Sequence, residues 1–397
     1  MEVYLEKTKS VHIPNTQEEI LNRAKEIVPI LKAASEEIEQ NRRLPSNIVE
    51  LLRSSGVFRA AMPKEWGGPE LNSMQQTQLI ETIATGDVSA AWCSMIGMDS
   101  GIYSGFLPPD VAKNIYPRLD MANSGWIHPQ GKAERVDGGY LLSGHWRFGS
   151  GITHCDVLVA GVAVYKNGVL ELDPITQKTP HWRVMIAKPE QFIIRDTWFT
   201  TGLAGSGSLD YSVESLFIPD EHSFSFSEPY RAGPLHIAPD AILRKMSGIP
   251  LGMARACIDY VLDLAPNRIE RETKQPWVND YRFQAAIASA EIELYSARTA
   301  VYTSLEKQWK QLEEGKEVSS EDRVLTALAR YNAFQSARSI VQKMYNLVGG
   351  SSIYQPSPLD RWLRDAQTMC QHAVAQDSIL QLTGNVLVGG KSTSPFF

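Results

Sequence analysis

The chain has 397 residues, of which 43% are hydrophobic and 21% are charged, and its formal net charge is −6. This length and composition are typical of a globular protein with two or three domains and a substantial hydrophobic core. The acidic balance gives no electrostatic reason to expect nucleic acid or an anionic membrane as a partner.

Cysteine usage and the N-terminal segment indicate a cytoplasmic protein. The four cysteines, Cys93, Cys155, Cys257 and Cys370, lie far apart and form no C-x-x-C pair. We therefore expect neither a disulfide framework nor a metal site. Residues 1–7 lack the basic start and apolar core of a signal peptide, and no apolar run approaches the length of a membrane span.

The chain up to about residue 118 has a helical pattern. Thr16 begins a capping box with Glu19, and apolar residues then recur at helical spacing. A second helix follows Pro45 and ends at Gly56, because glycine is the preferred residue just past a helix end. After a turn at 63–69, further helices are predicted over 73–85 and 88–106.

The sequence period changes from helix to strand around Met121. The turn at 137–139 and the alternating residues 140–148 predict a hairpin arm. Short apolar or β-branched segments follow at 157–164, 182–186, 192–196 and 211–219. Several short strands in series predict a small β-barrel or sandwich.

The last part of the chain is helical again from about Pro239. The predicted long helices cover residues 242–265, 278–313, 320–347 and 361–382. Four long helices in series indicate a helix bundle. The pattern therefore predicts a mainly α chain with a central β-domain, divided into an N-terminal helical domain at 1–118, a middle β-domain at 119–235 and a C-terminal four-helix bundle at 236–397.

Several segments in this order resemble the acyl-CoA dehydrogenase superfamily. Gly349-Gly350 followed by Arg361-x-x-Arg364-Asp365-Ala366 is similar to the C-terminal signature of that family. The segments 63–68, 143–146 and 196–208 resemble its N-terminal and middle domains. The resemblance covers nearly the whole chain and implies the acyl-CoA dehydrogenase fold.

The position of the family's catalytic base separates this chain from true dehydrogenases. Dehydrogenases carry a glutamate that removes the substrate α-proton at the position of Ala373, and a methyl group cannot do this. The preceding residue is His372, whose imidazole can act as an acid or a base near neutral pH. The combination resembles the two-component flavin-dependent monooxygenases built on the same fold.

This branch implies an activity, a cofactor and partners. Its members are oxygenase components that receive reduced FMN or FAD from a separate NAD(P)H:flavin reductase. They form a C4a-hydroperoxyflavin with O₂ and hydroxylate a small aromatic or heteroatom-containing substrate. The resemblance also implies a homotetramer, and it assigns catalytic roles to His372 beside the substrate and to Ser150 beside the flavin.

The resemblance also assigns flavin contacts in the β-domain. Phe148 and Ser150 stand where the family contacts the flavin ring near N5, and a hydroxyl there suits a proton that must stay on N5. Gly205, Ser206 and Ser208 form a glycine–serine loop whose backbone could approach a phosphate or the ring. A plain serine turn and a plain hairpin loop are the structural alternatives.

Further cofactor contacts are expected from the bundle. Arg268 lies near the place of a family arginine that meets the flavin phosphate, and Arg271 competes for this role. Gly349 and Gly350 occupy the segment that meets the flavin tail of a neighbouring subunit in the superfamily.

Four residues are predicted to contact the substrate. Trp92 and Met98 fall on a helix that faces the substrate in the family, and Trp126 and His128 lie in a segment that runs beside the flavin. Core packing is the alternative for the first two residues. Relatives often have a second histidine where this chain has Gln367, so a mechanism with two histidines is in doubt.

Two other functions remain open from sequence. An FAD-dependent acyl-CoA dehydrogenase would need a base elsewhere, and Asp259 and Asp263 are the candidates on a bundle helix. The other alternative is a relative that binds flavin or a ligand without catalysis; it is disfavoured because Ser150 and His372 are both present.

Overall fold

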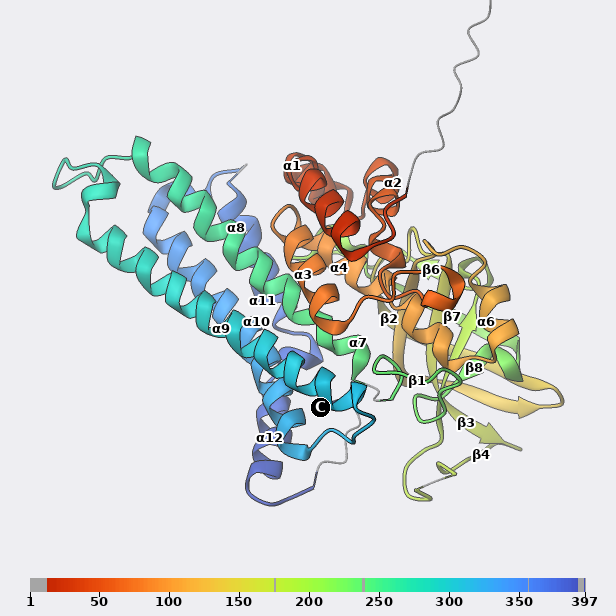
Figure 1. Cartoon of the computed structure of the whole chain (residues 1–397). Coiled ribbons are helices and arrows are strands. Elements are labelled where there is room, and N and C mark those ends of the chain that lie inside the picture. Colours follow the sequence, from red (N-terminus) through yellow and green to blue (C-terminus); the bar gives the residue numbers. More distant parts are fainter. Residues whose placement is uncertain (1–12, 175, 238–239, 356, 392–395, 397) are drawn as a thin grey trace, which may run out of the picture.

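The computed structural model describes residues 13–174, 176–237, 240–355, 357–391 and 396. Helices come first, a β-sheet follows, and a second set of helices ends the chain (Figure 1), which is the predicted order. The predicted domain boundaries at 118/119 and 235/236 both fall between elements. The N-terminal segment 1–7 and the predicted helix start near Pro239 lie outside the described residues.

The N-terminal part consists of α1 (Gln17–Asn41), α2 (Ser46–Ser55), α3 (Ser73–Ala84), α4 (Val88–Gly97), α5 (Ser100–Tyr103) and α6 (Pro109–Ile115). Thr16 forms the predicted capping box with Glu19, and Gly56 ends α2 with a φ of 83°. The single helix predicted over 88–106 is wrong. It is divided into α4, α5 and a short 3₁₀ turn, because weak helix formers cluster around Gly97 and Asp99.

The strands form one eight-stranded sheet. They are β1 (Asn123–Val136), β2 (Gly139–Gly149), β3 (Val157–Lys166), β4 (Val169–Leu170), β5 (Trp182–Ala187), β6 (Ile193–Arg195), β7 (Leu209–Pro219) and β8 (Ser223–Phe224). The order is β6-β7-β2-β1-β3-β5-β8, with β4 paired to β3. Within the described residues the path runs from β6 to β8 without closing, so the module is an open sheet rather than a closed barrel.

Strand β1 contains the irregularity that shapes the site. It pairs in parallel with β3, and the register shifts between Trp126 and Gly131. The shift leaves residues 127–130 outside the regular ladder, as a β-bulge does. Trp126 is the last regularly paired residue before this stretch, and His128 lies within it.

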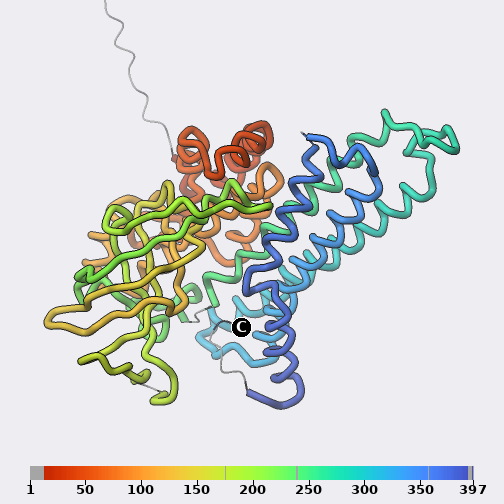
Figure 2. The backbone as a smooth tube through the Cα atoms, turned by 180° about the vertical axis from the view of Figure 1, so that it is seen from behind, coloured from red at the N-terminus to blue at the C-terminus, as the bar shows by residue number. Residues whose placement is uncertain are grey.

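The C-terminal helices form a bundle beside the sheet (Figure 2). They are α7 (Ala241–Arg244), α8 (Gly248–Leu264), α9 (Tyr281–Glu313), α10 (Ser320–Val348), α11 (Pro358–Met369) and α12 (Ser378–Leu387). Close contact between α3 and α8 ties the bundle to the N-terminal helices. A Cβ atom on Gly252 would lie 2.1 Å from the Glu81 carbonyl oxygen, so only glycine permits this approach.

The last predicted helix, 361–382, is also wrong, because it is interrupted between α11 and α12. His372 has an extended backbone and caps a 3₁₀ turn, η11 (Ala373–Ala375), instead of lying within a helix. Polar side chains satisfy backbone groups that the break leaves free: Gln335 Nε2 donates to Ala375 O (2.8 Å), and Gln376 Nε2 donates to Gln371 O (2.6 Å). The break turns His372 toward the sheet.

No helix in the described part of the chain is both long and apolar enough to cross a membrane.

Candidate active site

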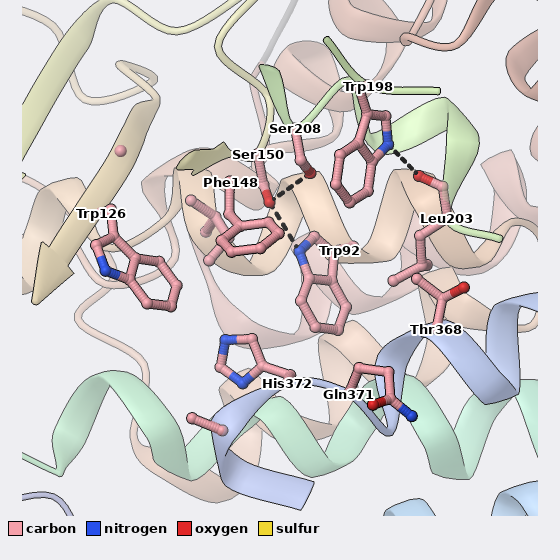
Figure 3. Close-up of a pocket in the computed structure, with 13 residues that line it drawn as sticks. Trp92, Trp126, Phe148, Ser150, Trp198, Leu203, Ser208, Thr368, Gln371 and His372 are labelled. Atoms are coloured by element: carbon pink, nitrogen blue, oxygen red, sulfur yellow. Dashed lines mark hydrogen bonds between the residues drawn. The ribbon is translucent and has the colours of Figure 1, made fainter. Parts of the chain in front are cut away.

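A cavity of about 180 Å³ lies where β1, the end of β2, α4 and the α11–α12 break meet. Figure 3 shows most of the side chains around it. Its lining combines aromatic rings with a few polar groups: Trp92, Ile96, Gly125, Trp126, Phe148, Ser150, Trp198, Leu203, Ser208, Thr368, Gln371, His372 and Ala373. A mostly apolar cavity with a few polar groups is typical of a small-molecule site.

Three serines and a tryptophan form a connected chain of hydrogen bonds at one side of the cavity. Trp92 Nε1 donates to Ser150 Oγ at 3.0 Å, and Ser150 Oγ lies 2.8 Å from Ser208 Oγ (Figure 3). Ser208 Oγ lies 2.7 Å from Ser206 Oγ, which donates to the Leu203 carbonyl oxygen at 2.7 Å.

The direction of this chain follows from counting protons, because each hydroxyl has one. Ser206 gives its proton to a carbonyl, so it accepts from Ser208. Ser208 has then used its proton, so it accepts from Ser150. Ser150 therefore receives the Trp92 N–H, donates to Ser208 and keeps one acceptor position. Its open position suits an N–H donor in the cavity.

The end of β2 holds Ser150 in place through a tight turn. Phe148 has a φ of 64°, which is unusual for a residue with a side chain, and its carbonyl accepts from Ser150 N at 2.8 Å. Gly151 N donates to the Ser206 carbonyl at 2.9 Å, which joins this turn to the serine loop. Backbone contacts therefore fix the spacing between Ser150 and the other serines.

Aromatic rings form the walls of the cavity. The Trp126 and Phe148 rings lie 5.6 Å apart, and the Phe148 and Trp198 rings lie 6.2 Å apart. Trp126 Nε1 is buried and has no hydrogen-bond partner among the described residues. Flat apolar walls with an open acceptor suit a planar, polar-edged ring.

His372 lies at the opposite side of the cavity from the serines. Its ring is 5.5 Å from Trp92 and 6.3 Å from Trp126, with edge-on geometry to both. Nδ1 accepts a long hydrogen bond of 3.4 Å from Val374 N, so the proton of the neutral ring is on Nε2. Burial, and to a smaller extent the positive charge of Arg330, lowers the pKa of His372 to about 4. The imidazole is therefore neutral near pH 7.

Comparison with known proteins agrees with this geometry. The family models described as acyl-CoA dehydrogenase N-terminal and C-terminal domains match residues 14–107 and 246–377. The chain is 30% identical to indole-3-acetate monooxygenase of Acinetobacter baumannii, over 91% of each chain. The chain belongs to the acyl-CoA dehydrogenase family. Within this family, it is a flavin-dependent monooxygenase.

A second relative and a solved structure are similar to the chain in sequence and in fold, respectively. The chain is 26% identical to the flavin-dependent monooxygenase oxygenase subunit HsaA of Rhodococcus jostii, over 89% of this chain and 94% of that one. The structure of XiaF from a Streptomyces species, solved with FADH2 and glycerol, has the same fold with a TM-score of 0.85 and 19% identity. It covers 96% of this chain and 97% of that chain.

Most site residues expected from sequence surround the cavity of this flavin-dependent monooxygenase. Six line it: Trp92, Trp126, Phe148, Ser150, Ser208 and His372. Ser206 stands behind Ser208 as the next member of the serine chain. His128 lines a second cavity, which shares Trp126 and His372 with the first.

Other expected residues lie elsewhere. Met98 is fully buried in the hydrophobic core and lines neither cavity, so the structure supports its packing alternative. Gly205 packs its backbone against α1, where an added Cβ would lie 2.2 Å from Ile38 Cγ2. Gln367 is exposed, and Gln371 lines the cavity instead.

Arg268, Gly349 and Gly350 line neither cavity. Arg268 Nη1 donates to Ser351 Oγ at 2.9 Å, and its guanidinium lies 5.6 Å from the Trp277 ring. Gly349 ends α10 with a φ of 68°, and both glycines are exposed with open space where a Cβ would be. The three residues therefore gather around one link of the bundle, between α10 and α11.

Sequence reasoning missed six residues that line the cavity: Ile96, Gly125, Trp198, Leu203, Thr368 and Gln371. Thr368 and Gln371 lie within two helical turns of the Arg364-Asp365-Ala366 signature. Helical periodicity counted from that motif could therefore have identified them as neighbours of the site. Leu203 carries no local signal. Its left-handed φ of 50° becomes visible only in the folded chain.

The positions of Asp259 and Asp263 do not support the alternative of an acyl-CoA dehydrogenase with its base elsewhere. Asp259 is exposed and pairs with Arg255 at 2.8 Å, and Asp263 is also exposed. Among the described residues, no carboxylate lines the first cavity, and Asp99 is the carboxylate that lines the second. A family member without a carboxylate beside Ala373 lacks the proton acceptor that a dehydrogenase needs.

Proposed function

We propose that this chain is the oxygenase component of a two-component flavin-dependent monooxygenase that hydroxylates a small aromatic substrate. The observation that carries the proposal is one cavity with Ser150 on one side and His372 on the other, and Ala373 where a dehydrogenase has its base. The relatives named as indole-3-acetate monooxygenase and as an oxygenase subunit support an aromatic substrate.

The residues around the cavity fit a flavin ring. Trp126, Phe148 and Trp198 offer flat apolar surfaces, and Ser150 offers an open acceptor. Reduced FMN or FAD, when bound, supplies the activation of O₂. Ser150 would accept the N–H that reduced flavin carries at N5, while Ser208 and Ser206 keep the Ser150 hydroxyl oriented. A donated hydrogen bond at that atom holds its proton in place.

His372 orients the substrate rather than removing its proton. A general base works best when its pKa lies near the working pH, and a pKa of about 4 makes the neutral ring a weak base. Nδ1 is already engaged by Val374 N, and Nε2 remains as a donor. The imidazole therefore donates to an acceptor on the substrate, such as a phenolic or carbonyl oxygen. This contact orients the aromatic ring of the substrate that is hydroxylated.

The remaining cofactor contacts come from a second subunit in this proposal. Arg268, Gly349 and Gly350 lie at one link of the bundle, away from the residues that line the cavity. They serve the flavin tail of a neighbouring copy, as the family resemblance implies. The proposal therefore includes a homotetramer and a separate NAD(P)H:flavin reductase.

Isotope labelling tests the function. The protein is mixed with chemically reduced FMN or FAD, ¹⁸O₂ and a panel of indoles and phenols, and products are identified by mass spectrometry. One ¹⁸O atom in a hydroxylated product is expected. The result that contradicts the proposal is release of H₂O₂ with every substrate together with oxidation of an acyl-CoA thioester, which would indicate a dehydrogenase.

Light scattering tests the assembly. A mass of four chains is expected, and Arg268→Ala should weaken flavin binding without changing Ser150-dependent coupling. A strict monomer that binds flavin as tightly as the parent would overturn the assignment of Arg268, Gly349 and Gly350 to a neighbouring copy.

A further inference from the structure

A second cavity opens beside the first. Its volume is about 300 Å³, and it shares Ile96, Gly125, Trp126, His372 and Ala373 with the flavin cavity. Its remaining walls are mostly aliphatic and come from α4, α7, η11 and α12, including Met95, Ile242, Met246, Val374, Ile379 and Leu382. Because His372 borders both cavities, a molecule in the second one reaches the proposed hydroxylation site.

The second cavity has one polar corner, formed by neighbouring residues of β1. Asn123 Oδ1 accepts from Tyr116 Oη at 3.1 Å, and Asn123 Nδ2 has no partner in the described chain. Ser124 Oγ and Trp126 Nε1 are also buried without partners. Asn123 is 2% exposed and Ser124 is 1% exposed. Buried donors without acceptors are costly, so these groups point to an acceptor on a bound molecule.

The charge at this corner is negative or neutral. The Asp99 carboxylate lines the cavity and pairs with Lys245 Nζ. Lys245 is fully buried and also donates to the Ile242 carbonyl at 3.2 Å, so its ammonium is committed. Among the described residues, neither cavity is lined by a lysine or an arginine. Arg330 on α10 is buried, its charge acts on His372, and its Nε and Nη2 have no hydrogen-bond partner in the described chain, but it lines neither cavity.

The unpartnered donors and the lack of a basic side chain on the cavity walls distinguish neutral substrates from anionic ones. A carboxylate placed in this cavity would lose its hydration without a lysine or arginine on the cavity wall to pair with, and it would lie near Asp99. A neutral carbonyl or amide oxygen would satisfy the open donors of Asn123, Ser124 and Trp126 at no such cost. An N–H group on the same molecule could donate to Asp99.

We infer that the second cavity binds a neutral aromatic molecule with a hydrogen-bond acceptor and disfavours an aromatic carboxylate of the same shape. The inference rests on the proposed function, because it names the substrate class of that same site. It separates this chain from its relative named for indole-3-acetate, which is an anion at neutral pH.

A matched pair of ligands tests the inference without flavin or turnover. Indole-3-acetamide and indole-3-acetate have nearly the same shape and differ in charge. Their binding to the flavin-free full-length protein is measured by calorimetry at pH 8. The amide should bind with a Kd at least about tenfold lower than that of the acetate. Equal or tighter binding of the acetate, or binding of neither ligand, overturns the inference.

Two variants identify the residues responsible. Asn123→Ala should weaken amide binding about tenfold and leave acetate binding unchanged, because it removes a donor without changing charge. Asp99→Asn should raise acetate affinity relative to the amide, because it frees the Lys245 ammonium. If Asp99→Asn does not fold, the Asn123 variant and the ligand pair decide. Unchanged amide binding in Asn123→Ala contradicts the inference.

The outcome is distinguishable from failure of the proposed function. Incorporation of ¹⁸O into indole-3-acetate, together with tighter acetate binding, would keep the monooxygenase and reject the neutral substrate class. Absence of ¹⁸O incorporation together with selective amide binding would reject the monooxygenase and keep the ligand preference.

Discussion

The Asp365 carboxylate accepts a hydrogen bond from the backbone N–H of Leu203, with 2.6 Å between Oδ1 and N. This bond joins α11 of the bundle to the loop that carries Ser206 and Ser208. Leu203 has a left-handed backbone, which costs free energy for a residue with a side chain. Asp365 therefore holds the serine loop in the conformation that orients Ser150.

Replacing Asp365 separates the role of the acceptor from the role of the charge. Asp365→Ala leaves the Leu203 N–H buried without a partner and should lower the free energy of unfolding by about 1 to 3 kcal/mol. Asp365→Asn keeps an acceptor oxygen and should cost less at pH 7. Chemical denaturation measures both, and hydrogen exchange should be faster in the 203–208 loop of the alanine variant. Equal exchange in parent and alanine variant would show that the bond does not hold the loop.

The same aspartate predicts a pH-dependent difference in stability. Burial, and to a smaller extent the negative charge of Asp87, raises the pKa of Asp365 from 3.8 to about 7. The unfolded chain thus loses this proton near pH 4 and the folded chain near pH 7. The parent loses stability as pH rises across this window, and Asp365→Asn has no such group.

The free energy of unfolding of Asp365→Asn relative to the parent should therefore rise by roughly 4 kcal/mol between pH 4 and pH 8, at about 1.4 kcal/mol for each unit by which the pKa is raised. Urea denaturation at both values measures it, and other titrating groups cancel in the difference. A difference that stays constant or falls with pH would show that the carboxyl is ionised in the fold like an ordinary aspartate.

Ser150→Ala removes the serine oxygen that accepts from Trp92 Nε1 and keeps an open acceptor position at the cavity wall. Its loss should weaken the hold on the flavin N–H by about 1 to 3 kcal/mol and raise the share of O₂ released as H₂O₂. The ratio of H₂O₂ to hydroxylated product measures this. Ser94→Ala is the matched control, because Ser94 is also buried and its hydroxyl has no partner. Equal coupling in both variants would remove Ser150 from the mechanism.

His372 variants distinguish orientation from acid–base chemistry. His372→Ala should reduce hydroxylation by on the order of a hundredfold, the scale on which such groups contribute. His372→Gln keeps a donor and should recover part of the rate if the imidazole orients the substrate. Product formation is measured with reduced flavin in excess, and thermal unfolding verifies the fold. A glutamine variant as slow as the alanine variant would favour proton transfer.

The pH dependence of the parent enzyme gives an independent test of His372. Because its pKa is lowered to about 4, the ring stays neutral between about pH 6 and pH 8. Any inflection of kcat/KM in that range should therefore persist in His372→Gln. Loss of an inflection in the variant would show that His372 titrates near neutrality and acts as a base.

The sequence alone determined the order of elements and the type of chemistry. Local signals define helix ends, as at Thr16 and Gly56, because capping and left-handed geometry involve neighbouring residues. His372 next to Ala373 excluded the dehydrogenase base at that position, because the identity of a side chain is enough to exclude a proton acceptor. These features needed no knowledge of distant contacts.

The tertiary structure decided which serines form the hydrogen-bond chain beside Ser150 and which residues surround the polar corner of the second cavity. Ser150 and Ser208 are 58 residues apart, and Asp99 and Lys245 are 146 residues apart, so no sequence period links them. The break at His372 also escaped prediction, because Gln335, from the distant helix α10, satisfies the Ala375 carbonyl there and an apolar helical pattern continues across the break. Hydrogen bonds between distant segments choose one arrangement among many that the same local pattern allows.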